Sequence, residues 1–447
     1  MNDLKHIFKA YDVRGKVGTE LTPKVVENIG KAFADWLPES GVIAVGRDMR
    51  PDSAELAAAL IKGITAQGRD VIDIGEVTSD MIYFAVGKYG LAGGAVITAS
   101  HNPGAYNGIK FCREQAKPIG EDTGMFEIRD AVIAQKYSQS SKTGKVTNKD
   151  VVDAWVDHVL DFVDTASLKP LKLVVDAGNG MAGKIFPELE PYVPFEVTEM
   201  YFELDGTFPN HIANPLEAKN LQDMVKVIKE EKADVGLAFD GDGDRAVLVD
   251  EKGQPLSGTV MTAILAKYFL DKHPGATILH NAITGRMVRE TVEKHGGTAV
   301  RTRVGHSLVK QKMREHGGVF AGEHSGHYYF KDNFMADSGL IAAVVALAVL
   351  SDSGKKLSAL ADTYRKYQTI PETNFEVSDK EAVMKRVADS FEGAEIDWLD
   401  GLTLIFDDGW VNVRPSNTEP LLRLNAEADT KPKLDQYVAK AKKIIVG

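Results

Sequence analysis

Several polar stretches carry side chains that could bind or transfer a phosphoryl group. The first, Ala95-Val-Ile-Thr-Ala-Ser-His-Asn-Pro103, is an apolar run that breaks into a hydroxyl, an imidazole and an amide. Residues 95–97 predict a short buried parallel strand, because they are apolar on both faces and follow two glycines. Ser100 then stands at the carboxyl end of this strand, where open α/β sheets bind ligands. A turn without function is the alternative for this stretch taken alone.

A second stretch, Asp240-Gly-Asp-Gly-Asp-Arg245, places three carboxylates on a glycine-rich loop after an apolar strand. Such carboxylates repel one another unless a hard cation lies between them, and Mg²⁺ prefers oxygen ligands of this kind. An EF-hand calcium loop is an alternative, because Glu251 stands at the twelfth place, but Arg245 occupies the sixth place, where that loop needs glycine. The pattern favours a magnesium site over a calcium sensor or a purely structural turn.

Two further stretches could bind the rest of a phosphorylated substrate. Gly322-Glu-His-Ser-Gly-His327 offers a carboxylate, a hydroxyl and an imidazole to the hydroxyls of a sugar. Arg414-Pro-Ser-Asn-Thr-Glu-Pro420 offers a guanidinium, two hydroxyls and an amide to a phosphate. Near the N-terminus, Arg14 beside Gly15 is another candidate phosphate ligand. Together with a serine that can carry a phosphoryl group and a Mg²⁺ site, these residues predict phosphoryl transfer on a phosphorylated polyol.

The elements around Ser100 predict an α/β unit. Strands are expected over 41–46, 70–75 and 95–97, and helices over 23–37, 53–67 (with Ser53 as its N-cap) and about 80–89. This β-α-β-α-β order predicts a parallel sheet covered by helices. The same order recurs between about 171 and 239 and between 276 and 321, and each final strand runs into a polar loop. We therefore predict three related α/β units.

The rest of the chain has a different pattern. Segments 402–406, 410–413 and 421–426 alternate apolar and polar residues, which predicts an antiparallel sheet with one face in water, followed by a helix over 432–445. The longest apolar run, 339–350, is too short to span a bilayer. It predicts a buried core helix after an N-cap at Asp337 or Ser338.

Length and composition limit the classes of protein. A chain of 447 residues suggests three or four domains, and 44% hydrophobic with 26% charged residues indicates a globular protein. The net charge of −11 and the lack of a basic cluster argue against nucleic-acid binding. The single cysteine, Cys112, excludes an intrachain disulfide and fits a reducing cytosol, where it would be a small buried hydrophobe. The N-terminus lacks the apolar core of a signal peptide, so a cytoplasmic protein is expected.

One motif favours a different class of enzyme. Gly178-Asn-Gly-Met-Ala-Gly183 fits the G-x-G-x-x-G pattern of dinucleotide-binding proteins, follows a predicted strand, and precedes the acidic residues Glu196 and Glu199. A nicotinamide or flavin enzyme would not explain why the other strand-end loops are rich in phosphate and metal ligands. A tight structural turn is the preferred interpretation.

Four of these stretches, in chain order, resemble the signature loops of the α-D-phosphohexomutases: Thr98-Ala-Ser-His-Asn-Pro103, Asp240-Gly-Asp-Gly-Asp-Arg245, Gly322-Glu-His-Ser-Gly-His327 and Arg414-Pro-Ser-Asn-Thr-Glu-Pro420. The resemblance covers essentially the whole chain. Within the family, the Arg-x-Ser-Asn-Thr form is most similar to bacterial phosphomannomutase/phosphoglucomutase. Phosphoglucosamine mutases usually carry Ser-Gly-Thr-Glu there, so Asn417 favours the first group.

The resemblance implies a fold of three related mixed α/β domains and a smaller α+β C-terminal domain around a central cleft. The expected boundaries are 1–145 for a phosphoserine domain, 146–250 for a metal-binding domain, 251–367 for a sugar-binding domain and 368–447 for a phosphate-binding domain. It also implies that Ser100 carries a phosphoryl group, which passes to the substrate to give a hexose 1,6-bisphosphate. The other phosphoryl group of this intermediate then returns to Ser100.

The resemblance further implies a set of site residues, with Mg²⁺ and hexose 1,6-bisphosphate as cofactors. The metal ligands would be Asp240, Asp242, Asp244 and a phosphate oxygen on Ser100. The residues around the transferred phosphoryl would be Arg14, His101, Lys110, Arg245 and His306. The substrate would contact Tyr11, Glu323, Ser325, His327, Arg414, Ser416, Asn417 and Thr418.

Two points stay open. Lys110 and His306 are both candidates for the general base, because a base is defined by geometry. His324 replaces a methionine common in the sugar loop of this subgroup, and His280-Asn-Ala-Ile-Thr284 stands where dual-specificity members often have a lysine. Both departures leave the preference among sugars open.

We therefore expect a cytosolic, Mg²⁺-dependent mutase for the 1- and 6-phosphates of mannose and also of glucose. It would act as a monomer or a small homo-oligomer, without nucleic acid or a membrane as partner. Phosphoglucosamine mutase is the near alternative. A dinucleotide-dependent oxidoreductase, a non-enzymatic metal-binding module and a phosphatase with the same phosphoserine are remote ones.

Overall fold

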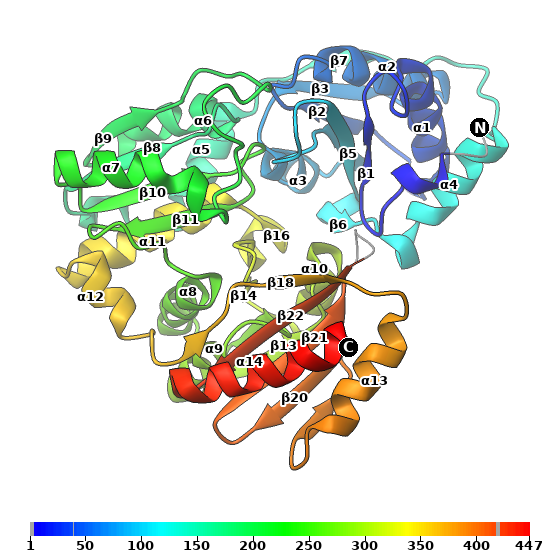
Figure 1. Ribbon diagram of the computed structural model, residues 1–447. Coiled ribbons are helices and arrows are strands. Elements are labelled where there is room, and N and C mark those ends of the chain that lie inside the picture. Colours follow the sequence, from blue (N-terminus) through cyan, green and yellow to red (C-terminus); the bar gives the residue numbers. More distant parts are fainter. Residues whose placement is uncertain (1–3, 39, 417–420) are drawn as a thin grey trace.

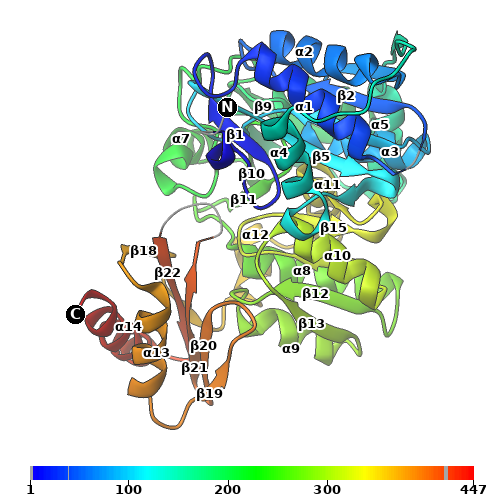
Figure 2. The same ribbon diagram turned by 90° about the vertical axis from the view of Figure 1, so that its right-hand side faces the viewer.

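The computed structural model describes residues 4–38, 40–416 and 421–447, and its chain forms four sheets with their helices (Figure 1). The first two sheets lie side by side at the top of Figure 1, the third lies below them, and the C-terminal sheet lies at the bottom. Figure 2 shows the C-terminal sheet standing beside the third, with the ends of β21 and β22 directed towards the upper units. Loops from all four units can therefore meet in the middle of the molecule.

The first sheet has the strand order β1-β5-β4-β2-β3-β7, with β6 beside β5. Side chains alternate between its two faces: Ile43 and Val45 pack with helices α1 and α2, and Ala44 packs with α3. The sheet is therefore covered on both faces, as the helix positions predict. Its elements are β1 (Val13–Lys16), α1 (Pro23–Trp36), β2 (Ile43–Arg47), α2 (Ser53–Ala66), β3 (Val71–Glu76), α3 (Ser79–Lys88), β4 (Gly93–Ile97), β5 (Tyr106–Arg113), β6 (Lys117–Pro118), α4 (Met125–Ala134) and β7 (Val146–Asn148).

The second and third sheets repeat part of this order. The first sheet contains the run β5-β4-β2-β3, the second is β11-β10-β8-β9, and the third contains β15-β14-β12-β13, with β16 beside β15. The second unit consists of α5 (Val152–Leu160), β8 (Leu171–Asp176), α6 (Ala182–Leu189), β9 (Phe195–Met200), α7 (Gln222–Glu231), β10 (Val235–Phe239) and β11 (Ala246–Asp250). The third consists of α8 (Gly258–Lys272), β12 (Thr277–Asn281), α9 (Arg286–Lys294), β13 (Thr298–Thr302), α10 (His306–His316), β14 (Phe320–Gly322), β15 (Tyr328–Phe330), β16 (Ala336–Asp337), α11 (Gly339–Ser353) and α12 (Leu357–Asp362). The predicted threefold repeat is confirmed.

The predicted strands pair in parallel, as expected, but each repeat also contains an antiparallel strand that the sequence pattern did not reveal. Strands β5, β11 and β15 pair antiparallel with β4, β10 and β14, respectively. In β5, Asn107 and Lys110 interrupt the apolar pattern although both are buried. Each polar loop is therefore the connection of a hairpin, and its two ends are fixed by adjacent strands.

The C-terminal sheet has the order β17-β22-β21-β20-β19, with β18 also beside β22, and its pairings are antiparallel, as predicted. Its elements are β17 (Gln368–Thr369), β18 (Thr373–Glu376), α13 (Lys380–Ser390), β19 (Glu395–Asp397), β20 (Leu402–Phe406), β21 (Gly409–Pro415), β22 (Leu421–Ala428) and α14 (Lys431–Val446). The domain boundaries expected from the sequence stay predictions. Strand β7, which starts at Val146, pairs with β3 of the first sheet.

Helix α11 joins the second and third units. Ser338 caps it by accepting a hydrogen bond from the Ile341 N–H at 3.1 Å, and the helix packs against α5, α8 and β11. It is the buried core helix that the longest apolar run predicts. Ser53, in contrast, does not cap α2: it is the first residue of the helix, and its hydroxyl donates to Asp48 at 2.5 Å. Among the described helices, none combines the length and the apolar character that crossing a membrane requires.

Candidate active site

Ser100 lies in the β4–β5 hairpin loop, in a backbone conformation that is rare for residues other than glycine. Its φ is 50°, in the left-handed region. The buried guanidinium of Arg50 holds the loop by donating to the carbonyl oxygens of Ser100 at 2.7 Å, Asn102 at 2.5 Å and Tyr106 at 2.8 Å. Asp48 lies 3.4 Å from Nε of Arg50 and balances its charge. No local signal in the sequence indicates this role of Arg50, because its partners lie about fifty residues away.

The loop between β10 and β11 approaches the Ser100 loop so closely that only glycine fits at the contact. A β-carbon at Gly241 would lie 2.4 Å from the carbonyl oxygen of Ser100. This approach brings the Ser100 hydroxyl to Asp240, and Oγ donates to Oδ2 at 2.6 Å. The predicted serine and the predicted acidic loop therefore form one site.

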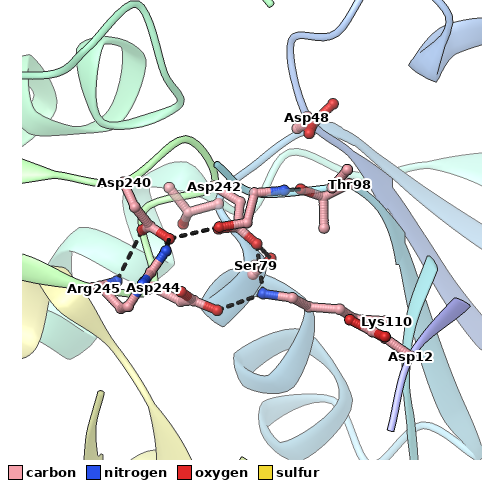
Figure 3. Close-up of polar contacts among 12 residues, drawn as sticks. Asp12, Asp48, Ser79, Thr98, Lys110, Asp240, Asp242, Asp244 and Arg245 are labelled. Atoms are coloured by element: carbon pink, nitrogen blue, oxygen red, sulfur yellow. Dashed lines mark hydrogen bonds and ion pairs between the residues drawn. The ribbon is translucent and has the colours of Figure 1, made fainter. Parts of the chain in front are cut away.

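The three aspartates of this loop form a buried cluster, drawn in Figure 3. One oxygen from each of Asp240, Asp242 and Asp244 lies within 4.8 Å of the others. Lys110 on β5 donates to Asp242 at 2.6 Å and to Asp244 at 2.5 Å, and Arg245 donates from Nε to Asp240 at 2.9 Å. Oδ1 of Asp242 and Oδ1 of Asp244 are buried without a hydrogen-bond partner among the described residues. Unpaired buried carboxylate oxygens fit a site for a divalent cation.

The charges in this cluster shift one another's pKa. Burial raises the pKa of Asp240, and the neighbouring aspartates add to this effect while Arg245 opposes it. Burial also acts against the charged form of Asp242, but Lys110 outweighs it and holds the pKa of this carboxyl far below its usual range. For Lys110, burial acts to lower the pKa, and Asp242 and Asp244 more than offset it, so the lysine is an ammonium here.

Two more predicted residues, His101 and Arg14, lie at the Ser100 loop. Nδ1 of His101 lies 3.0 Å from Oγ of Ser100 and also contacts Arg245. Burial and then the charges of Arg245 and Arg14 lower the pKa of His101, which favours the neutral ring. Arg14 is held by Asp12 at 2.7 Å and donates to the carbonyl oxygen of Ala99 at 3.1 Å. The hydroxyl therefore lies beside a neutral imidazole and the carboxylates, and Arg14 adds a cation to its loop.

The β14–β15 loop presents a carboxylate with fixed orientation. Glu323 is buried and accepts hydrogen bonds from Tyr329 Oη at 3.1 Å and Ser325 Oγ at 3.2 Å. Nδ1 of His327 lies 3.1 Å from the same serine hydroxyl, and its Nε2 lies 3.7 Å from Asp244. The predicted sugar-binding residues thus lie against the acidic cluster.

His306 begins helix α10 and packs edge-on against Tyr11, with ring centroids 4.5 Å apart. Its Nδ1 is buried without a hydrogen-bond partner in the described part of the chain. Burial lowers its pKa, and the charges of Lys310 and Lys110 lower it further, so the ring is neutral near pH 7. A neutral ring can accept a proton.

The predicted phosphate loop connects β21 and β22. Arg414 is buried on β21, and the Ser416 N–H donates to the carbonyl oxygen of Leu421 at 2.9 Å. Asn417 and Thr418 lie outside the described residues.

One cleft of about 650 Å³ collects the predicted side chains from all four units. Asp240 and Asp242 lie deeper, beneath this surface. The predicted residues that line the cleft are Tyr11, Arg14, Ser100, His101, Lys110, Asp244, Arg245, His306, Glu323, Ser325, His327 and Arg414.

Family models match the chain along most of its length. Those described as phosphoglucomutase/phosphomannomutase alpha/beta/alpha domains I, II and III match residues 5–139, 153–253 and 257–367, and the C-terminal domain model matches 372–444. The chain belongs to the phosphoglucomutase/phosphomannomutase family. Its members are phosphohexomutases, which are isomerases, so the predicted family and class of enzyme are confirmed.

Individual relatives of this family agree over nearly the full length. The protein named "Phosphohexose mutases" from Xanthomonas campestris is 42% identical over 423 residues, 94% of each chain. The phosphomannomutase of Escherichia coli K12 is 37% identical over 431 residues, again 94% of each chain. The crystal structure of a phosphoglucomutase/phosphomannomutase family protein from Burkholderia thailandensis has a TM-score of 0.91 at 33% identity and covers 98% of this chain and 96% of that one.

In this phosphohexomutase, the glycine-rich turn after β8 supports the acidic loop. The Met181 N–H donates to the carbonyl oxygen of Gly241 at 2.9 Å, and a β-carbon at Gly180 would lie 2.8 Å from that same oxygen. Protein backbone therefore occupies the place that a dinucleotide phosphate would need. Glu251, the carboxylate of the EF-hand alternative, instead accepts hydrogen bonds from Ser358 at 2.5 and 3.1 Å.

A further contact of the acidic loop was not visible in the sequence. Ser79, at the start of α3, donates from Oγ to Asp242 at 2.5 Å, and its N–H donates to the carbonyl oxygen of Asp242 at 2.9 Å. Ser79 thereby connects the acidic loop to the first unit. A serine before a helix is usually a cap, so no local signal distinguishes this role.

Proposed function

We propose that this phosphohexomutase interconverts the 1-phosphates and 6-phosphates of mannose and also of glucose, through a phosphoserine at position 100. The observation that carries this proposal is the 2.6 Å contact between Oγ of Ser100 and Asp240, at a cleft lined by residues of all four units. A hydroxyl placed among carboxylates and guanidinium groups suits a phosphoryl carrier. The negative charge of the phosphoryl group that it carries can be balanced by a cation and by the arginines.

The proposed reaction has two transfers. In the first, the bond from phosphorus to Oγ of Ser100 breaks, a bond to the free hydroxyl of the substrate forms, and the proton of that hydroxyl passes to a base. The resulting hexose 1,6-bisphosphate reorients in the cleft. In the second, Oγ of Ser100 attacks the other phosphorus, and the sugar oxygen that leaves takes up a proton. The enzyme is then phosphorylated again, and the phosphate has changed position.

The other site residues bind the substrate and orient it. Glu323, fixed by Tyr329 and Ser325, accepts hydrogen bonds from the 3- and 4-hydroxyls in both orientations of the sugar. Arg414 binds the phosphate that does not react, with Ser416, Asn417 and Thr418 of the same loop, and Tyr11 and His327 complete the sugar site. Arg14, His101 and Arg245 hold the phosphoryl group that moves. The cation would be Mg²⁺ on Asp240, Asp242, Asp244 and a phosphate oxygen of Ser100, where it supplies charge neutralisation.

Lys110 and His306, the two candidates for the general base, have different neighbours. Lys110 is held as an ammonium by Asp242 and Asp244, so it can accept a proton only when those carboxylates are engaged by another cation. His306 has a lowered pKa and an unpartnered Nδ1 among the described residues. Since Mg²⁺ on Asp242 and Asp244 would be such a cation, both Lys110 and His306 stay candidates for the proton acceptor. We also propose a cytosolic protein that acts as a monomer or small homo-oligomer.

Phosphorus NMR tests the proposed activity. The purified protein is mixed with Mg²⁺, a trace of hexose 1,6-bisphosphate and, in parallel samples, mannose, glucose and glucosamine 1-phosphates. We expect the 6-phosphate to form from mannose and glucose 1-phosphates. Fastest conversion of the glucosamine sample would replace the proposal by a phosphoglucosamine mutase. Release of inorganic phosphate alone would replace it by a phosphatase.

A further inference from the structure

Glu372 places a carboxylate against Arg414 of the proposed phosphate site and against the neighbouring Arg423. It lies between β17 and β18, which both pair with β22 of the C-terminal sheet, and its side chain is 21% exposed in the same cleft as Ser100. Its Oε1 lies 3.0 Å from Nη1 of Arg423, and its Oε2 lies 3.6 Å from Nη2 of Arg414. Figure 2 shows β18 beside β22, at the end of the C-terminal sheet that faces the other units.

Two more groups hold this carboxylate in place. Asn425 on β22 donates to Oε2 at 3.0 Å, and Nε2 of His324 in the sugar loop lies 3.9 Å from the same oxygen. Burial acts to raise the pKa of Glu372, but His324, the Asn425 amide and the two arginines outweigh it, so the pKa lies below its ordinary value. Glu372 is therefore an anion that lies between His324 of the sugar loop and the side chains of strands β21 and β22.

A carboxylate and a phosphate compete for the same donors. Both are oxyanions that arginine binds through parallel N–H groups. Glu372 offers one negative charge to two guanidinium groups, whereas a sugar phosphate dianion offers two. A bound phosphate therefore matches Arg414 and Arg423 better than Glu372 does, and both anions on the same donors would repel each other.

We propose that Glu372 occupies the position of the non-reacting substrate phosphate in the free enzyme, and that substrate binds by displacing it. This inference rests on the proposed function, because that function assigns the phosphate to Arg414. Glu372 is then a positioning residue: it keeps the two arginines paired when no substrate is bound, and it promotes release by returning to them. Because Glu372 lies in the short connection between β17 and β18, the displacement is a local movement of that connection.

Calorimetric binding of inorganic phosphate and of glucose 1-phosphate tests the competition. Glu372→Gln keeps the shape of the side chain and an acceptor for Asn425 but removes the charge. We expect it to bind both ligands at least about fivefold more tightly than the wild type, with a lower KM and no rise in kcat. Glu372→Asp, which keeps a competing charge, should stay close to the wild type.

The matched control is Glu376→Gln. Glu376 is exposed on β18, four residues further along, and forms no ion pair with Arg414 or Arg423 among the described residues. An unchanged or weaker affinity of Glu372→Gln would overturn the inference, and so would an equal gain in Glu376→Gln, which would indicate a general charge effect. If the wild type converts sugar phosphates but Glu372→Gln binds phosphate and glucose 1-phosphate no more tightly than the wild type does, this inference alone fails. If the wild type converts none, the proposed function fails and the inference with it.

Discussion

Ser100 is held in an unfavourable backbone conformation by contacts from two units. A left-handed φ at a residue other than glycine costs on the order of 1–3 kcal/mol and persists only where the surroundings fix it. Here Arg50 binds the carbonyl oxygen of Ser100, and Asp240 accepts its hydroxyl. These contacts direct the hydroxyl to the acidic cluster, which is the position that the proposed phosphoryl transfer requires.

At the same scale, Glu323→Ala tests how the sugar is held. The variant removes the carboxylate that Tyr329 and Ser325 orient. Glucose and mannose differ only at the second carbon, so we expect kcat/KM to fall by about a hundredfold for both substrates. Parallel assays with the two 1-phosphates check this. A loss confined to one sugar would contradict a role in binding the 3- and 4-hydroxyls.

Residues with a distinctive local pattern could be predicted, and residues defined by distant partners could not. The three aspartates alternate with glycines after a strand, and Ser100 ends an apolar run, so both stood out in the sequence. Arg50 and Ser79 look like an ordinary surface arginine and an ordinary helix start. Their roles come from Ser100 and Asp242, fifty and more than a hundred residues away, and only the folded chain brings these partners together.

At the scale of elements, the hairpin is the unit that presents each functional loop. Strand β4 was predictable because it is wholly apolar, but its partner β5 was not, because Lys110 lies opposite Val96 within the sheet. A buried lysine in a strand breaks the apolar pattern, and its partners Asp242 and Asp244 belong to another unit. The helices and strands that were predicted lie within a few residues of their observed positions, whereas α4, α5, α12, α13 and several short strands were not predicted.

Gly241→Ala tests the contact between two of these hairpins. The added β-carbon would lie 2.4 Å from the carbonyl oxygen of Ser100, so one loop must move away. We expect mutase activity to fall by at least about a hundredfold, with a loss of stability of about 1–3 kcal/mol. Steady-state kinetics and thermal unfolding measure the two effects.

The control for this variant is Gly275→Ala. Gly275 has a positive φ of 78° but no atom within 4 Å of the added carbon, so it should lose about 1 kcal/mol of stability and keep its activity. Full activity of Gly241→Ala would show that the close approach of the two loops is not needed for catalysis.

At the scale of the molecule, buried polar contacts connect the units around the cleft. Asp80 on α3 accepts a hydrogen bond at 2.6 Å from Ser338, the cap of α11, and so joins the first unit to the third. The recurring chain order of strands and helices in the three units was predictable from the sequence. The way the units face one another was not, because it depends on such single contacts, which carry no periodic signal.

The stability of this junction should depend on pH. Burial raises the pKa of Asp80 to about 7, above the unfolded value of about 3.9. The folded state therefore binds the proton more tightly, and the stability that this confers is present below about pH 4 and is lost as the pH rises towards 7. Asp80→Asn is neutral throughout, so we expect the difference in melting temperature, variant minus wild type, to be larger at pH 8 than at pH 5. A difference that stays constant between these pH values would contradict a raised pKa.

The most direct test of the account is the transfer of a phosphoryl group to Ser100. The protein is incubated with Mg²⁺ and glucose 1,6-bisphosphate labelled with radioactive phosphorus, and mass spectrometry locates the modification. We predict label on Ser100, its transfer to added glucose 1-phosphate in a single turnover, and loss of both labelling and mutase activity in Ser100→Ala, because the carrier oxygen is gone. Near-normal turnover in Ser100→Ala, or label on another residue, would contradict the proposed mechanism.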